Sequence, residues 1–300
     1  MILMNRVAVL ALLFLSGSEG FQPVQHPVHV PSINKKSKQA VEFAKFSDVT
    51  QSNIPSSSSS LLASSSSNEQ GDESGLDLGA VAKYAIALVT QVSLFYGFFS
   101  LLDAGVAATG FQPYFWMNFG LFYVMSLRSR IFNPLSNKRP DPATLEAAGV
   151  EKRNMPSWTP PGVIFPIMWI LIIGPLRAAS TAMVYDVTNS YAAPAIMAFA
   201  LHLSIGDVWN TINNVEQRYG ASVTGVACVW LSKANAAFQY SLVSPMAGQL
   251  MSLPLIWLTV ASALITATWR LNPSSETGKV DPLYPVASSK ASTEFAWFQQ

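Results

Sequence analysis

One apolar stretch, residues 160–185, constrains the fold of this chain more than any other segment. It opens on Pro160-Pro161, a pair that suits the first turn of a helix because the N–H groups there have no partner within the helix anyway. The stretch exceeds the ~20 apolar residues with which a helix crosses a bilayer. Pro175 and Arg177 interrupt it, and inside a membrane both need neighbouring helices, the proline for the carbonyl that it leaves free and the arginine for its charge. The stretch therefore predicts a membrane helix that packs within a bundle.

The composition of the whole chain agrees with a membrane protein. Of 300 residues, 50% are hydrophobic and 12% are charged, whereas soluble domains carry about 25% charged residues. The net charge of +1 offers no field that would attract nucleic acid. The sequence therefore predicts an all-α, polytopic membrane bundle. We expect membrane helices at Ala80–Leu102, Gln112–Phe132, Pro160–Tyr185, Tyr191–Asn213, Ala221–Val243 and Gly248–Leu271.

The basic residues of the connections gather on one side of the membrane. We call the side of the 133–157 connection side A and the opposite side side B. The side-B connections, residues 103–111, 186–190 and 244–247, contain no Lys or Arg. By the positive-inside rule side A is the cytoplasm-like side, and with six spans both ends of the bundle lie there.

The first 75 residues have the pattern of a targeting leader. Residues 1–20 combine Arg6, a short apolar run and a small-residue zone, as in a secretory signal peptide. Residues 21–75 are rich in Lys and Ser and too poor in apolar residues to fold, so we expect a disordered, transit-like segment. A signal peptide followed by Phe21 resembles the two-part leader of algae with complex plastids, which implies a plastid membrane. The alternative is a plain signal peptide with a disordered linker and a secretory-pathway membrane.

Tryptophan and proline residues form an ordered set of motifs across the apolar region. The set contains, in order, Pro156-Ser157-Trp158-x-Pro160-Pro161, Phe165 with Trp169, Ile205 with Trp209, Arg218-x-Gly220, Ser244-Pro245 with Ala247 and Leu250, Pro254 with Trp257, Ala261 and Leu264, and finally Trp269-Arg270-Leu271-Asn272. Over residues 114–272 this set resembles the TspO/MBR family, the tryptophan-rich sensory or translocator proteins. One such short motif alone would be weak, but this order and spacing are specific.

The resemblance implies a five-helix core over residues 112–272. An additional transmembrane helix and turn, residues 80–111, precede the core, and an irregular tail, residues 273–300, follows it. The resemblance also implies a protein of the lipid bilayer that binds a hydrophobic small molecule near the first loop of the core. A tetrapyrrole such as haem or protoporphyrin IX is the expected ligand, with no covalent cofactor, for sensing, trafficking or buffering. A homodimer is one expected assembly.

The resemblance implies that the residues at the family's pocket positions bind the ligand in this chain. An indole suits this role because it offers a flat apolar face and one N–H donor. A ligand with carboxylates also needs a cation, and Arg177 and Lys233 are the basic residues expected at membrane depth. The predicted ligand-binding residues are Trp158, Trp169, Arg177, Trp209, Trp257, Ala261 and Leu264, with Trp169, Trp209 and Trp257 as the walls of the pocket.

The sequence gives little support for catalysis or metal binding. It contains no Ser/His/Asp nucleophile arrangement, phosphate loop, carboxylate pair at catalytic spacing or Cys/His metal spacing, so no catalytic or metal-binding residue is predicted. Its single cysteine, Cys228, excludes an internal disulfide. Arg177 in place of a small glycine, and Gly206-Asp207 in place of an asparagine, depart from the family pattern and predict a divergent branch. Two alternatives stay open: an enzyme that degrades porphyrin with light or oxygen, and a membrane scaffold without ligand.

The polar residues inside the spans predict contacts between helices. Counted from side B, Arg177 and His202 lie at similar depths in neighbouring spans, so we expect them to meet. Asp207 lies further toward side A, and contact with Arg177 would require a stretched side chain. We interpret these residues either as paired charges that hold helices together or as recognition of a ligand anion by Arg177 or Lys233.

We predict that the leader is cleaved between Gly20 and Phe21 and that a fluorescent fusion of residues 1–75 enters the plastid. Phe21→Ala should leave the fusion in the secretory pathway, because Phe21 marks the new amino terminus in a two-part leader. Microscopy of both fusions in an alga with a complex plastid checks this. Unchanged import of the Phe21→Ala fusion would overturn the two-part leader.

Overall fold

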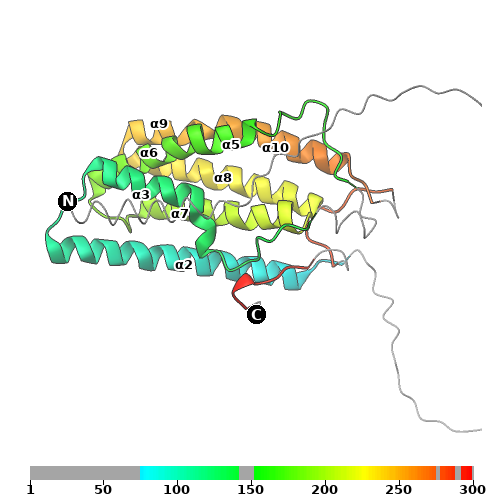
Figure 1. Ribbon diagram of the computed structural model, residues 1–300, viewed down its shortest axis with the longest axis horizontal. Helices are drawn as coiled ribbons and strands as arrows, with labels where there is room; N and C mark the ends of the chain where they lie inside the picture. The colour runs from blue at the N-terminus through cyan, green and yellow to red at the C-terminus, as the bar shows by residue number, and fades with distance from the viewer. Residues whose placement is uncertain (1–74, 142–151, 275–277, 288–291, 299–300) are drawn as a thin grey trace, which may run out of the picture. The chain divides into compact units, whose positions relative to one another are not determined.

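The computed structural model describes residues 75–141, 152–274, 278–287 and 292–298, so the predicted signal peptide and nearly all of the transit-like segment lie outside the described residues. The described residues form helices, with two isolated bridges and no strand (Figure 1). The elements are α2 (Leu78–Thr109), α3 (Phe115–Arg128) with the 3₁₀ turn η1 (Ser129–Phe132), α5 (Ile164–Pro166), the π-helix η2 (Ile167–Ile173), α6 (Gly174–Thr188), α7 (Pro194–Asn210), the π-helix η3 (Thr211–Val215), α8 (Tyr219–Val243), α9 (Pro245–Ser252), α10 (Pro254–Arg270) and the 3₁₀ turn η4 (Ala296–Phe298).

Each apolar segment that was expected to span the membrane contains a helix, which confirms the all-α, polytopic bundle. Four helical segments are long and apolar enough to cross a bilayer: Leu78–Thr109, Ile164–Thr188, Pro194–Val215 and Pro245–Arg270. The helix α3 has 14 residues, and α8, with 25 residues, is less apolar than these four. The six-span topology and the domain boundaries therefore stay predictions.

The helix α2 is longer than predicted, with 32 residues in place of the expected span Ala80–Leu102. Asp77 caps its amino end, because the Oδ1 atom accepts the Ala80 N–H at 2.8 Å. Gly110 ends the helix at a φ of 64°, a left-handed conformation that glycine adopts without strain. Both residues lie outside the apolar run that set the expected boundaries.

The helices pack around a core rich in aromatic rings. The helix α6 lies against α3 and α9, α7 against α8 and α2, and α8 against α9 and α10 (Figure 1). In the core, the ring of Phe99 lies 6.2 Å from that of Phe122 and 6.4 Å from that of Tyr191, measured between ring centres. These rings come from α2, α3 and the α6–α7 turn, so their contacts join the additional helix to the rest of the bundle.

Asp103 attaches α2 to the bundle near side B. Its carboxylate accepts three hydrogen bonds from the α6–α7 turn, from Ser190 Oγ at 2.7 Å, the Tyr191 N–H at 2.7 Å and the Ala192 N–H at 3.0 Å. Hydrogen bonds to a charged acceptor are stronger than neutral ones. This one side chain therefore fixes the position of the turn against α2.

Gln91 attaches α2 in the middle of the bundle. Its buried side-chain amide donates to Asp207 Oδ2 of α7 at 2.7 Å and to the Ser129 carbonyl at 3.0 Å. Its Oε1 atom accepts a hydrogen bond from Asn133 Nδ2 at 2.7 Å. Every polar atom of the Gln91 side chain thus has a partner, as a buried amide requires.

The helix that contains Pro175 is π-helical over η2, just before the proline. Pro175 has no N–H, so the Ile170 carbonyl, five residues earlier in the π-helical register, lacks its backbone donor. The Tyr123 hydroxyl of α3 donates to this carbonyl at 3.0 Å. Gly174 permits this approach, because a Cβ there would lie 2.9 Å from Tyr123 Cε2. A neighbouring helix therefore satisfies the carbonyl that the proline frees, as the sequence predicted.

The C-terminal tail runs across the side-A end of the bundle. Leu76, just before α2, forms a bridge with Val286, and the Trp269 indole of α10 donates to the Asp281 carbonyl at 2.8 Å. We call residues 281–287 and 292–298 the C-terminal strap. It contacts α8, α2 and the loop after η1 through the pairs Thr224–Leu283, Lys83–Thr293 and Leu135–Phe295.

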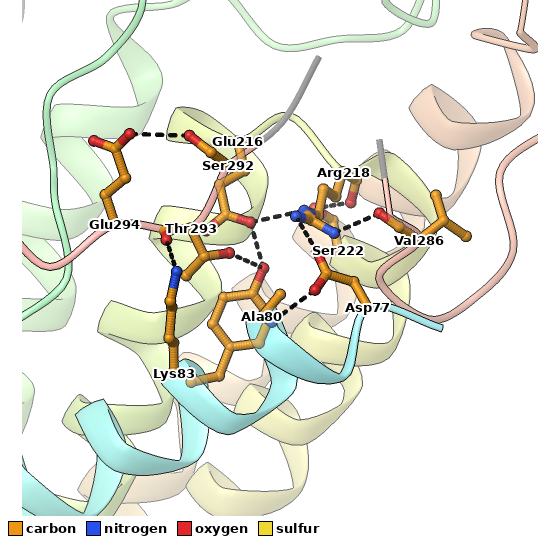
Figure 2. A network of polar contacts seen from close by, with 11 residues as sticks. Asp77, Ala80, Lys83, Glu216, Arg218, Ser222, Val286, Ser292, Thr293 and Glu294 are labelled. Carbon is orange, nitrogen blue, oxygen red and sulfur yellow. Dashed lines mark hydrogen bonds and ion pairs between the residues drawn. The ribbon is translucent and has the colours of Figure 1, made fainter. Parts of the chain in front are cut away.

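Arg218, at the start of α8, joins the strap to α2 (Figure 2). Its guanidinium lies 2.8 Å from Asp77 Oδ2 and 2.9 Å from Glu216 Oε2, and it donates to the Val286 carbonyl at 2.7 Å. The Tyr84 hydroxyl of α2 donates to the Glu216 carboxylate. Burial raises the pKa of Glu216, although the contacts with Tyr84 and Arg218 oppose this rise. The network connects three segments that lie far apart in the sequence.

We predict that Asp103→Ala lowers the stability of the purified protein by about 1–3 kcal/mol, because it removes the acceptor of the Tyr191 and Ala192 N–H groups. The thermal unfolding midpoint in detergent measures the change. Asp186→Ala is the matched control, since Asp186 is exposed beside the same turn and should leave the midpoint unchanged. Equal midpoints for Asp103→Ala and wild type would show that Asp103 does not anchor α2.

Candidate functional site

The loop that carries the Trp-x-Pro-Pro motif is held at side A by the residues just before the motif. Arg153 Nη2 donates to the Asn213 carbonyl at 2.6 Å, and the guanidinium lies 4.9 Å from the centre of the Tyr219 ring. Asn154 and Asn272 exchange two hydrogen bonds, at 2.8 and 2.9 Å. The loop is therefore fixed both to the η3–α8 turn and to the end of α10.

An open groove of about 650 Å³ lies between this loop and the last turns of α10. Trp158 is 50% exposed and forms one wall. Ala263, Ala267 and Arg270 recur at helical spacing and form the opposite wall, with the guanidinium at the end nearest side A. The full lining is Pro156, Ser157, Trp158, Ala263, Thr266, Ala267, Arg270 and Leu271. This arrangement suits a flat apolar molecule with an acidic edge.

Three of the predicted ligand-binding residues lie further along α10, toward side B. Trp257, Ala261 and Leu264 follow at positions i, i+4 and i+7 and so share one face of the helix. Phe165 meets Trp257 edge-on, with ring centres 5.8 Å apart. Trp257 Nε1 is buried and has no hydrogen-bond partner among the described residues. This N–H is a donor that a ligand with an oxygen atom can satisfy.

Trp169 and Arg177 form a separate pair inside the bundle. The Arg177 guanidinium lies 5.3 Å from the centre of the Trp169 ring, within the range of a cation–π contact. Arg177 Nη2 also lies 2.9 Å from His202 Nε2, which confirms the predicted meeting of these two residues. Asp207 makes no direct contact with Arg177; its carboxylate accepts the hydrogen bond from Gln91.

Trp209 lies at the contact between α7 and α8. Its indole N–H donates to the Ser222 carbonyl at 3.1 Å. Gly225 of α8 lies directly against the ring, and a Cβ there would approach Trp209 Cδ1 to 2.8 Å. The ring therefore packs two helices together, and its N–H has a partner within the protein.

The structure thus distributes the predicted pocket residues over several places. Trp158 lines the groove, Trp257, Ala261 and Leu264 share a face of α10, and the remaining three lie elsewhere in the bundle. Their binding role stays a prediction. Sequence reasoning missed Arg270 as a groove residue, although its spacing from Ala263 and Ala267 on α10 was a usable signal. It also missed the anchoring role of Arg153 and Asn154, which depends on partners far away in the sequence.

The described residues contain no group of three or more His, Cys, Asp or Glu side chains that could hold a metal ion. The groove offers the indole of Trp158 and the guanidinium of Arg270, and the interior offers the guanidinium of Arg177 and the amine of Lys233. These groups bind apolar rings and anions.

Comparison with known proteins finds similarity over this region of the chain. Residues 141–270 match the model of the TspO/MBR family. Protein CrtK of Rhodobacter capsulatus is 28% identical over 126 residues, which cover 40% of this chain and 76% of that protein. A tryptophan-rich sensory protein of Cereibacter sphaeroides is 27% identical over 119 residues, which cover 40% of this chain and 73% of that protein. The matched family region includes the loop and α5 to α10, and α2 and α3 precede it.

We predict that Arg153→Ala loosens the loop beside the groove, because the bonds to Asn213 and Tyr219 are lost together. Amide hydrogen exchange in residues 153–158, measured by mass spectrometry, should become at least several-fold faster. Lys152→Ala is the matched control, since the exposed Lys152 side chain makes none of these contacts. Equal exchange in the two variants would assign the loop's position to other contacts.

Proposed function

Because this chain belongs to the TspO/MBR family through residues 141–270, we propose that this integral membrane protein binds a tetrapyrrole in the groove between the Trp158 loop and α10. Its role would be to sense, traffic or buffer that ligand. Haem and protoporphyrin IX are the candidate ligands. We further propose a plastid membrane as its location, on the basis of the leader that the sequence predicts before Phe21.

The half-exposed indole of Trp158 carries this proposal. A tryptophan offers a large flat apolar surface, and at the end of a membrane bundle this surface faces a groove of a size that suits small-molecule ligands. A tetrapyrrole macrocycle is also flat and apolar, so stacking against Trp158 would cover both surfaces. The small side chains of Ala263 and Ala267 leave room for the second face of the ring.

Arg270 supports an anionic ligand. Natural porphyrins carry carboxylates on one edge of an apolar ring, and a guanidinium binds a carboxylate through two parallel hydrogen bonds. Arg270 lies at the end of the groove nearest side A, where such an edge can remain in contact with water. The ring and the acidic edge would therefore each meet suitable chemistry.

The fixed position of the loop supports binding without a large rearrangement. The two hydrogen bonds between Asn154 and Asn272 and the contacts of Arg153 hold the loop before any ligand arrives. Ordering a loop only upon binding would reduce affinity, so a loop held in place favours it.

The test is binding of protoporphyrin IX to the detergent-purified protein, and the shift of the porphyrin absorption band measures this binding. Trp158→Ala should weaken binding about tenfold, since the loss of one aromatic contact is worth up to about 1.5 kcal/mol and 1.4 kcal/mol is one decade. Ala267→Phe should block the groove. Trp116→Phe is the control, because Trp116 is exposed on α3 and outside the groove.

The dimethyl ester of the porphyrin tests the role of Arg270. Wild type should bind the free acid more tightly than the ester, and Arg270→Gln should remove most of that difference. The proposal fails if wild type binds no more porphyrin than empty micelles do, or if Trp158→Ala and Ala267→Phe both bind like wild type.

A further inference from the structure

Two basic side chains lie inside the bundle, apart from the groove, where α6, α7, α8 and α9 meet. Arg177 of α6 is 6% exposed, and Lys233 of α8 is fully buried. Lys233 Nζ lies 2.6 Å from Met251 Sδ and 5.8 Å from the centre of the Phe199 ring. A thioether is a weak hydrogen-bond acceptor, and a phenyl ring carries no charge, so neither balances an ammonium ion.

Neither cation has a carboxylate as its partner. Among the described residues, no Asp or Glu oxygen lies within 4.0 Å of the side-chain nitrogens of Arg177 or Lys233. Asp207, the acid of α7, is held by Gln91 instead. Arg177 Nε is buried and has no hydrogen-bond partner in the described part of the chain.

His202 is the hydrogen-bond partner of Arg177 and is itself neutral. Arginine has only donors, so His202 Nε2 accepts the hydrogen bond from Arg177 at 2.9 Å. The proton of the ring therefore resides on Nδ1, which donates to Ser232 Oγ at 3.1 Å, and Ser232 donates in turn to the Val229 carbonyl at 2.9 Å. The imidazole supplies no negative charge. Lys233 Nζ and the His202 ring both lie against Phe199, 5.8 Å and 6.4 Å from the centre of its ring, so the two basic side chains belong to one cluster.

An unpaired ion inside a membrane is unfavourable, and arginine keeps its proton in proteins. We propose that a small monovalent anion binds between Arg177 and Lys233, either a halide ion or the carboxylate group of an acid dissolved in the membrane. The anion would accept a hydrogen bond from Arg177 Nε and would replace the Lys233–Met251 contact with a charge-assisted hydrogen bond. The site shares no residue with the groove, so this inference does not rest on the proposed function.

The test is the thermal midpoint of the protein in detergent with gluconate as the starting anion. Chloride, and separately laurate, are titrated at constant ionic strength, with methyl laurate as the uncharged control. Binding to the folded state should raise the midpoint by a few degrees and saturate. A response to chloride identifies a halide site, a response to laurate but not to its methyl ester identifies a carboxylate site, and a response to both identifies a site for either.

Variants assign the response to the cluster. Lys233→Met should fold, because an apolar side chain of similar length suits its surroundings and removes a buried charge, and it should lose the response. Arg177→Gln should also lose it. Lys138→Met, at an exposed position outside the helices, should keep it.

The proposal is overturned if wild type shows no saturable rise with either anion, or if both cluster variants respond like wild type. Loss of the response in either cluster variant, with Lys138→Met unchanged, supports the site. If Lys233→Met fails to fold, the wild-type titration and Arg177→Gln decide the question.

Discussion

Inside a bilayer a polar group has no water to bond, so its partner has to come from the protein, and the bundle is organised by this constraint. The Ile170 carbonyl accepts a hydrogen bond from the Tyr123 hydroxyl, and the Gln91 amide donates one to Asp207. Lipid tails are as apolar as leucine side chains, so the burial of apolar surface gives little free energy for packing α2 against the bundle. The polar contacts of Gln91 and Asp103, together with close aromatic packing, therefore determine where the additional helix lies.

The helices could be predicted from the sequence because an apolar run of spanning length is a local property. The meeting of Arg177 and His202 also followed from counting residues to the nearest turn. The partner of the Ile170 carbonyl in η2 could not be predicted, since the Tyr123 hydroxyl belongs to another helix. The groove likewise depends on a loop whose anchors reach distant partners. Matching positions to a family motif also does not show which indole N–H groups already have a partner within the protein. The Trp209 N–H, for example, donates to the Ser222 carbonyl.

In the interior of the bundle, a departure from the family pattern coincides with a buried basic side chain that has no acidic partner among the described residues. Arg177 stands where the resemblance implies a small glycine, and, like Lys233, it has no carboxylate partner among the described residues. The motif residues Trp158 and Arg270 at side A, by contrast, follow the pattern and line the groove. Proteins break local rules chiefly at functional sites, so this departure makes Arg177 a residue to test by substitution.

The C-terminal strap affects the order in which the molecule is completed. Lys83 of α2 donates a hydrogen bond to the carbonyl of Thr293 in the strap, and these two residues lie 210 positions apart in the sequence. The residues just before α2 leave the ribosome before any other described segment, yet Leu76 pairs with Val286, which emerges only after α10. The amino end of α2 therefore lacks these partners until the strap has been synthesised. The side-A end can therefore close only after the last helix and the strap have been synthesised.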